Sequence, residues 1–273
     1  MAERSSQIVN TSDVWLPAWD GAAYAANTGH HRVFDAPFLA TLPLEGDERI
    51  LDLCCGSGDF TRALADLVPG GKVVGVDAQP SMIELARACA APNQRFVLGA
   101  VQHVGALLPD AGGFDVVMSR SALHWVPEAD HAPLLAECFR QLRPGGRLRL
   151  EFGGGDNVRA MLALFDDCSA QLGGPRCPWT YLGAGHYLEL LESAGFSSAD
   201  GWVRTVAQRR AFDRASLIGW LESQCFQAYE ALLDPELHPQ LRAQVLDRVD
   251  EMRRADGTYD QTFVRLDVLA HRP

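Results

Sequence analysis

The stretch ILDLCCGSGDF (residues 50–60) places a short apolar run directly before a turn that contains two glycines. The apolar run predicts a buried β-strand, and the stripe formed by Phe60, Leu64 and Leu67 predicts an amphipathic helix after the turn. Glycine has no Cβ and adopts positive φ angles, so Gly56 and Gly58 allow the backbone to approach a bound ligand closely. The stretch therefore predicts a strand, a ligand-binding turn and a helix in succession.

Short β-rich runs alternate with helical patterns through the first half of the chain. The runs occur at residues 50–54, 73–77, 95–99, 114–119 and 146–152. Strands that alternate with helices indicate a parallel sheet. Two further strands are predicted at residues 202–212 and 261–270, which gives an α/β fold with a doubly wound, mostly parallel seven-stranded Rossmann-like sheet.

The regions outside this alternation predict an N-terminal helical segment and a helical cap. The predicted division is an N-terminal helical segment (1–45) over the ligand site, a core (46–153), and a remainder (154–273) that completes the sheet. The remainder carries a helical cap at about 156–182 and 214–255, where aromatic residues interrupt the regular pattern.

Composition excludes several classes of function. The net charge of −11 disfavours nucleic acid as a partner, since binding the phosphate backbone usually needs a clustered basic face. No apolar run approaches the roughly 20 residues that span a bilayer, so we expect a cytoplasmic protein with no membrane partner. The eight histidines show no metal-ligand spacing, and we expect no metal site.

Asp77 ends the second predicted strand, 19 residues after Gly58. A carboxylate at this edge of a parallel sheet can accept hydrogen bonds from a ribose diol. Thr61 stands where a dinucleotide fingerprint needs its third glycine, which disfavours a nicotinamide cofactor. The alternative is that Asp77 only caps the next helix and that the glycines only form a turn.

Taken in order, these motifs resemble class I S-adenosylmethionine-dependent methyltransferases. The turn at 52–59, Asp77, the segment FDVVMSRSALHWVPE (114–128) and the segment LRPGGRLRLEF (142–152) correspond to successive motifs of that superfamily. The LHWVP sequence at 123–127 is similar to the trans-aconitate methyltransferase group, whereas the Cys-Cys-Gly-x-Gly-Asp turn resembles the quinone C-methyltransferase group. The resemblance implies S-adenosyl-L-methionine as the cofactor.

The resemblance also implies which residues bind this cofactor. It places the methionine part against the glycine turn, the ribose on Asp77, adenine beside the helix that follows, and the sulfonium near Ser119. Cys54 replaces the first glycine of the family motif, and Gln102 or backbone groups at Val101 replace a carboxylate that often holds adenine. The predicted cofactor contacts are Tyr24, Arg32, Asp52, Cys54, Gly56, Gly58, Asp77, Ala78, Met82, Val101, Gln102 and Ser119.

The remaining candidates concern catalysis and the methyl acceptor. His124 follows the fourth strand and is predicted as a general base or a substrate contact, and packing against Trp125 is an equal alternative. His31 is a second candidate base. The predicted substrate contacts are the aromatic side chains Trp125, Trp179, Tyr181 and Trp220, for which a place in the hydrophobic core is the alternative.

The predicted function is transfer of a methyl group to a small-molecule acceptor through a carboxylate, hydroxyl or activated carbon. One alternative is a cyclisation or rearrangement enzyme with the same fold and cofactor, and another is a cofactor-binding regulator without turnover. Methyl transfer depends mainly on alignment, and a base is needed only for a protonated nucleophile. The sequence leaves open the acceptor, the choice between O-, N- and C-methylation, and whether the chain is a monomer or a homodimer.

Overall fold

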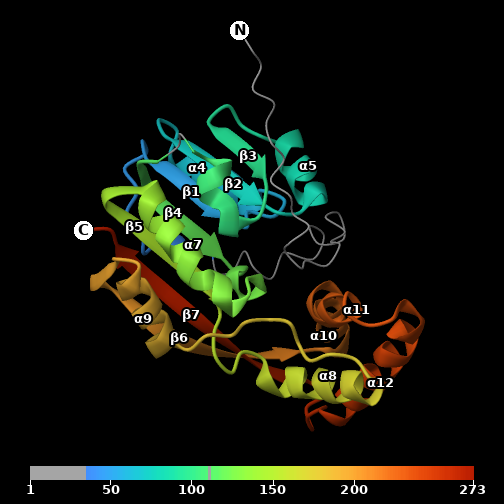
Figure 1. Ribbon diagram of the computed structural model, residues 1–273. Helices are drawn as coiled ribbons and strands as arrows, with labels where there is room; N and C mark the ends of the chain where they lie inside the picture. The colour runs from blue at the N-terminus through green and yellow to red at the C-terminus, as the bar shows by residue number, and fades with distance from the viewer. Residues whose placement is uncertain (1–34, 110–111) are drawn as a thin grey trace.

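A computed structural model describes residues 35–109 and 112–273. It contains one sheet of seven strands flanked by helices (Figure 1). The strands are β1 (Arg49–Leu53), β2 (Lys72–Asp77), β3 (Gln94–Leu98), β4 (Phe114–Arg120), β5 (Leu142–Gly153), β6 (Ser197–Phe212) and β7 (Tyr259–His271). The α-helices are α3 (Asp35–Leu39), α4 (Asp59–Leu67), α5 (Pro80–Ala88), α6 (Val104–Leu107), α7 (Glu128–Gln141), α8 (Arg159–Gln171), α9 (Ala184–Ser193), α10 (Arg214–Trp220), α11 (Phe226–Glu230) and α12 (His238–Glu251).

The strand order is β3-β2-β1-β4-β5-β7-β6, and strands β1 to β5 are parallel to one another. Strand β7 runs antiparallel to both β5 and β6. The order reverses beside β1, and open α/β sheets bind ligands in the crevice at such a switch point. The predicted α/β class with a mostly parallel seven-stranded sheet is confirmed.

Helices cover both faces of the sheet, because each helix has one apolar stripe. On one face α7 and α9 bury residues such as Leu134, Cys138 and Tyr187 against the strands. On the other face α3, α4 and α5 pack against the sheet, with Phe38 and Leu64 in the contact. These two layers fix where the carboxyl ends of the strands meet.

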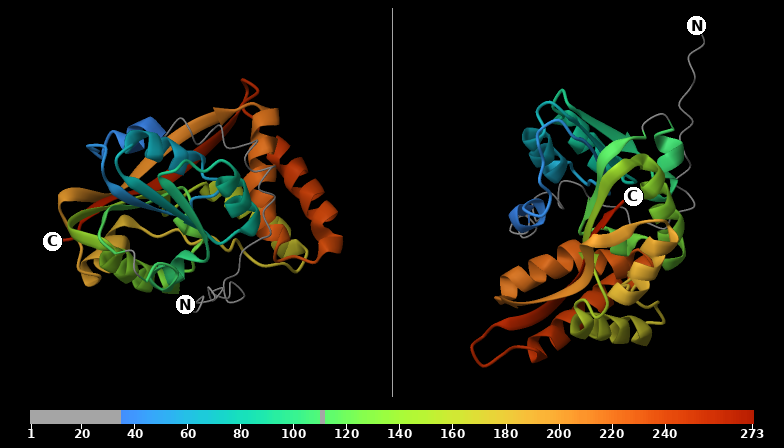
Figure 2. Two further views of the ribbon diagram at one scale, coloured as in Figure 1. Left: turned by 90° about the horizontal axis from the view of Figure 1, so that it is seen from above. Right: turned by 90° about the vertical axis from the view of Figure 1, so that its left-hand side faces the viewer.

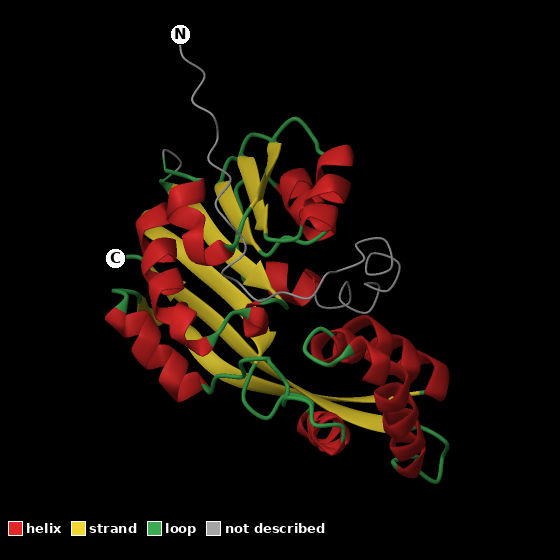
Figure 3. Ribbon diagram, turned by 45° about the vertical axis from the view of Figure 1, so that its right-hand side comes forward, coloured by secondary structure: helices red, strands yellow, loops and turns green. Residues whose placement is uncertain are grey.

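A separate group of helices forms a cap at one end of the molecule. Strands β6 and β7 extend beyond the other strands, and α8 and α10–α12 gather at the extended end (Figures 1 and 3). These helices share their own hydrophobic cluster, which includes Phe165, Phe226, Tyr229 and Val245, all with no exposed surface. We call α8, α10, α11 and α12 the cap.

Views from two further directions show the cap beside the edge of the sheet formed by β6 and β7, away from β3 (Figure 2).

In the described part of the N-terminal region, the Phe38 ring lies 5.8 Å from the ring of Phe60 and 4.1 Å from the guanidinium of Arg149. Residues 35–45 therefore pack on the α4 face of the sheet and line neither of the cavities described below. None of the described helices has the length and apolar character needed to cross a membrane.

Candidate active site

The turn after β1 and the end of β2 are tied together through Asp77. Its Oδ2 atom accepts a hydrogen bond from the Gly56 backbone N–H at 2.9 Å, and its Oδ1 accepts one from the Gln79 N–H, also at 2.9 Å. Burial raises the pKa of this carboxyl, and three backbone donors, at Gln79, Gly56 and Ala78, oppose that effect. Asp77 therefore holds the turn in place, and its carboxylate also borders the cavity described next.

The two glycines of the turn serve different purposes. Both have left-handed backbones, with φ of 56° at Gly56 and 78° at Gly58. A Cβ at Gly56 meets no atom within 4 Å, whereas one at Gly58 lies 2.9 Å from the Phe96 ring and 3.0 Å from Ala86. Gly56 thus leaves open space at the turn, and Gly58 allows α4 to pack closely against its neighbours.

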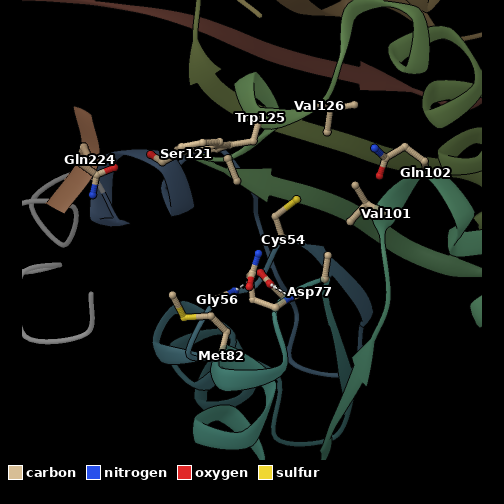
Figure 4. Close-up of a pocket in the computed structure, with 13 residues that line it drawn as sticks. Cys54, Gly56, Asp77, Met82, Val101, Gln102, Ser121, Trp125, Val126 and Gln224 are labelled. Carbon is tan, nitrogen blue, oxygen red and sulfur yellow. Dashed lines mark hydrogen bonds between the residues drawn. The ribbon is translucent and has the colours of Figure 1, made fainter. Parts of the chain in front are cut away.

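A first cavity opens at this edge of the sheet (Figure 4). Eight of the residues predicted for the cofactor or substrate line it: Cys54, Gly56, Asp77, Ala78, Met82, Val101, Gln102 and Trp125. Five further lining residues were not predicted from the sequence: Gln79, Ser121, Ala122, Val126 and Gln224. The Gln102 carboxamide donates to Asp130 at 3.3 Å, which leaves its oxygen available as an acceptor.

Three predicted cofactor residues lie beneath the first cavity and do not line it. Asp52 is buried and accepts a hydrogen bond from the Thr61 hydroxyl at 2.7 Å, and burial raises its pKa to about 7. The Ser119 hydroxyl donates to the Leu53 carbonyl at 2.8 Å. Gly58, as described above, faces packed side chains. Asp52 and Ser119 support the turn and the end of β1 through these buried hydrogen bonds, and Gly58 supports the turn through close packing.

Three other predicted residues, Tyr24, His31 and Arg32, lie outside the described residues. The predicted cofactor contacts at Tyr24 and Arg32 and the second candidate base at His31 therefore stay predictions.

A second cavity adjoins the first, between the end of β4 and the cap. Four predicted residues line it: His124, Trp179, Tyr181 and Trp220. The unpredicted lining residues are Ser121, Asn157, Val158, Gln208, Arg210, Gln224, Phe263 and Arg265. Among the described residues that line it, the charged side chains are two arginines, and none is acidic.

The arginines come from the long β6–β7 pair. Arg265 pairs with Glu151 through its Nε and Nη2 atoms, and Nη2 also donates to the Ser121 hydroxyl at 2.5 Å. Arg210 lies over the Phe263 ring at 4.9 Å, and burial together with the charge of Arg265 lowers its pKa. This end of the second cavity is therefore cationic and suits an anionic group.

His124 lies among aromatic rings at the wall of the second cavity. Its ring centroid is 5.6 Å from that of Trp179 and 5.8 Å from that of Tyr181. Burial, and secondly the charge of Arg265, lowers its pKa to about 3. Its Nδ1 atom is buried and has no hydrogen-bond partner among the described residues. His124 is thus neutral near pH 7, and its imidazole can donate a hydrogen bond to a ligand or accept one from it.

Most of the missed lining residues carried no recognisable local signal. Arg265 and Ser121 are 144 positions apart in the chain, and the antiparallel pairing of β7 with β5 brings the arginine to the cavity. Ser121 carried one usable signal, since it directly follows the fourth predicted strand at the edge where ligands collect.

Comparison with known proteins shows the enzyme family to which the chain belongs. A family profile described as a methyltransferase domain matches residues 50–146. The chain is 32% identical over 256 residues to a trans-aconitate 2-methyltransferase of Methylobacterium radiotolerans, covering 88% of this chain and 90% of that protein. The chain belongs to the class I S-adenosylmethionine-dependent methyltransferases. A second relative of the same name, from Variovorax paradoxus, is 29% identical and covers 93% of this chain and 98% of its own length.

Solved structures agree on the methyltransferase fold. A putative methyltransferase from Bacillus halodurans has a TM-score of 0.59 at 20% identity, covering 88% of this chain and 98% of its own. A phosphoethanolamine N-methyltransferase 2 from Haemonchus contortus, in complex with S-adenosyl-L-methionine, has a TM-score of 0.56 at 17% identity, covering 93% of this chain and 56% of its own. The class I assignment confirms the predicted cofactor, S-adenosyl-L-methionine.

The first cavity of this methyltransferase fits that cofactor. Asp77 presents a carboxylate at the boundary of the cavity, and the open space at Gly56 admits a ligand against the backbone. Met82 and Val101 supply apolar walls on which a purine ring can pack. A nucleoside needs such a hydrogen-bond acceptor for its ribose and such apolar walls for its base.

Proposed function

We propose that this methyltransferase forms a methyl ester on a carboxylate of a small polycarboxylic acid. The observation that supports the proposal is the second cavity, where Arg210 and Arg265 face the ligand space and no described lining residue is acidic. A guanidinium binds a carboxylate through charge-assisted hydrogen bonds. The relatives named above as trans-aconitate 2-methyltransferases are named for an acceptor of this chemical class.

In this proposal the first cavity holds the cofactor. Asp77 accepts hydrogen bonds from the ribose hydroxyls with the lone pairs that the backbone donors leave free. Ala78, Met82 and Val101 enclose the adenine, and the Gln102 oxygen accepts from its amino group. When bound, S-adenosylmethionine supplies an electrophilic methyl group on a sulfonium.

The second cavity holds the acceptor. The Nη1 atom of Arg265 makes no hydrogen bond to a described residue, since Glu151 and Ser121 occupy the Nε and Nη2 atoms. Nη1 therefore remains to bind an acceptor carboxylate. Trp179, Tyr181 and Trp220 supply apolar walls that shape the cavity and exclude water.

The chemistry requires alignment and no general base. A carboxylate oxygen forms the new bond to the methyl carbon, and the carbon–sulfur bond breaks with its electron pair left on sulfur. Carboxylic acids are ionised near pH 7, so no proton has to move. A neutral His124 fits this reaction as a hydrogen-bonding contact to the acceptor, and the enzyme contributes positioning.

The test is a methyl-transfer assay with trans-aconitate, its amide analogue and a catechol as acceptors. We expect only trans-aconitate to give a product, with a mass increased by the replacement of one hydrogen by a methyl group. Mild alkali should remove the added methyl group, because it hydrolyses an ester. A methyl group that survives alkali, or a preference for the amide or catechol, would contradict the proposal. A product of unchanged mass would instead favour a cyclisation or rearrangement.

A further inference from the structure

Gln224 lies where the two cavities meet. Among the described lining residues, only Ser121 and Gln224 belong to both cavities. Figure 4 shows Gln224 on the opposite side of the first cavity from Gln102, on a segment of its own. A methyl group that passes from one cavity to the other has to cross this boundary, so these two side chains flank its path.

The cap presents Gln224 from a local irregularity in its helix. A π-helical turn, η4 (Leu221–Cys225), connects α10 to α11. Leu221, Cys225 and Phe226 have no exposed surface and belong to the hydrophobic cluster of the cap. Trp220, at the end of α10, lines the second cavity. Gln224 therefore extends toward the cavities from a backbone that its neighbours anchor, and π-helical turns of this kind are frequent at functional sites.

The two side chains at the boundary differ in their hydrogen bonding. The Ser121 hydroxyl already accepts a hydrogen bond from Arg265. The half-buried Gln224 carboxamide makes no hydrogen bond to any residue in the described part of the chain. Its NH₂ group is thus available as a donor at the place where the acceptor carboxylate must meet the methyl group.

The electrostatics favour a neutral donor at this position. The cofactor carries a sulfonium charge, and a cationic side chain beside it would be repelled, whereas a carboxamide is not. The arginines of the second cavity supply the cationic contact and come from the β6–β7 pair, whereas Gln224 comes from the cap. A carboxamide at the boundary can therefore hold the reacting carboxylate without weakening cofactor binding.

We propose that Gln224 is a specificity-determining contact, whose NH₂ group donates a hydrogen bond to the reacting carboxylate of the acceptor. This inference rests on the proposed function, because it requires a carboxylate acceptor. It assigns a role in acceptor recognition to the π-helical turn of the cap.

The test compares Gln224→Ala and Gln224→Glu with the wild-type enzyme. Losing one hydrogen bond to a charged group corresponds to a rise in the KM for trans-aconitate of about tenfold for Gln224→Ala. Gln224→Glu should raise this KM further, because it places a second carboxylate against the acceptor. The affinity for S-adenosylhomocysteine, measured by calorimetry, should stay within about threefold of wild type in both variants, since that ligand carries no sulfonium. Gln240→Glu, at an exposed position of α12, is the control for the added charge.

The outcomes separate this inference from the proposed function. An unchanged KM in both Gln224 variants, with an active wild type, would overturn the role of Gln224 alone. A parallel loss of S-adenosylhomocysteine affinity and thermal stability would also overturn it, because it would indicate a purely structural residue. A wild-type enzyme that methylates no carboxylate would overturn both, and that result is visible before any variant is made.

Discussion

Replacing Gly56 and Gly58 by alanine, one at a time, separates two roles within one turn. Both positions are left-handed, which costs an alanine about 1–2 kcal/mol. At Gly58 the new Cβ also lies 2.9 Å from Phe96 and 3.0 Å from Ala86, and such overpacking adds about 1–3 kcal/mol. We therefore expect Gly58→Ala to lose about 2–5 kcal/mol of unfolding free energy and Gly56→Ala about 1–2 kcal/mol.

Cofactor affinity should change in the opposite order. The Cβ introduced at Gly56 meets no protein atom and stands at the wall of the first cavity, where it competes with the ligand. A clash there of about 1–3 kcal/mol weakens binding by roughly five- to hundredfold. Gly58→Ala adds no atom to the lining of the first cavity, so its affinity should stay close to that of the wild type.

Urea denaturation measures the stabilities, and calorimetric titration with S-adenosylhomocysteine measures the affinities. Gly173→Ala is the matched control, because Gly173 has a φ of 74°, meets no atom within 4 Å of a Cβ, and lines neither cavity. It should lose only the backbone cost. Equal losses of affinity in the Gly56 and Gly58 variants, or a Gly58 variant as stable as the Gly56 variant, would refute the reasoning.

Three further predictions concern the cavities and the core. Asp77→Ala should weaken S-adenosylhomocysteine binding in calorimetry by about tenfold or more, because it removes charged hydrogen-bond acceptors; an unchanged affinity would contradict the ribose contact. Arg265→Gln should destabilise the enzyme in urea by about 3 kcal/mol, because Glu151 is left unpaired, and adding Glu151→Gln should restore stability but not the KM for trans-aconitate. Burial lowers the pKa of His131 to about 4, so between pH 6.5 and 4 the unfolded chain binds a proton that the folded chain does not. The free energy of unfolding therefore decreases as the pH is lowered through this window. Between pH 7 and 5, His131→Phe should therefore lose about 2 kcal/mol less unfolding free energy than the wild type, and parallel pH curves would count against this.

The parallel core was predictable because its signals are local. The apolar run at 50–54, the glycine turn and Asp77 each lie within one strand and its following loop. Parallel strands bring their carboxyl ends to one edge, so a short-range pattern was enough to place Cys54, Asp77, Met82 and Val101 around one cavity.

The second cavity depends on long-range pairing that a single sequence does not reveal. The strand predicted at 202–212 begins at Ser197 in the structure, with a register shift between Ser197 and Trp202. A slip of one residue would turn every side chain of the strand to the other face. Whether Arg210 points into a cavity or into solvent is therefore settled by this register, and the local sequence around Arg210 is the same in both cases.

The difference between Ser119 and Ser121 has the same physical origin at shorter range. Strand β4 ends at Arg120, and Ser121 adopts a left-handed backbone with a φ of 60°. Alternation along an extended strand would place residues 119 and 121 on the same face, but the strand ends between them. Ser119 consequently bonds to the Leu53 carbonyl inside the sheet, while Ser121 lines both cavities.

Burial bears on the choice between general base and substrate contact that the sequence left open for His124. A histidine after the fourth strand suits a general base only if its pKa lies near the working pH. Burial and the nearby Arg265 lower that pKa to about 3. An imidazole with such a low pKa is a poor acceptor for the proton of a phenol or a carbon acid. The same Arg265 that disfavours a protonated His124 favours a carboxylate in the second cavity. Burial of His124, reinforced by Arg265, thus disfavours base catalysis, and the proposed carboxylate acceptor needs no base.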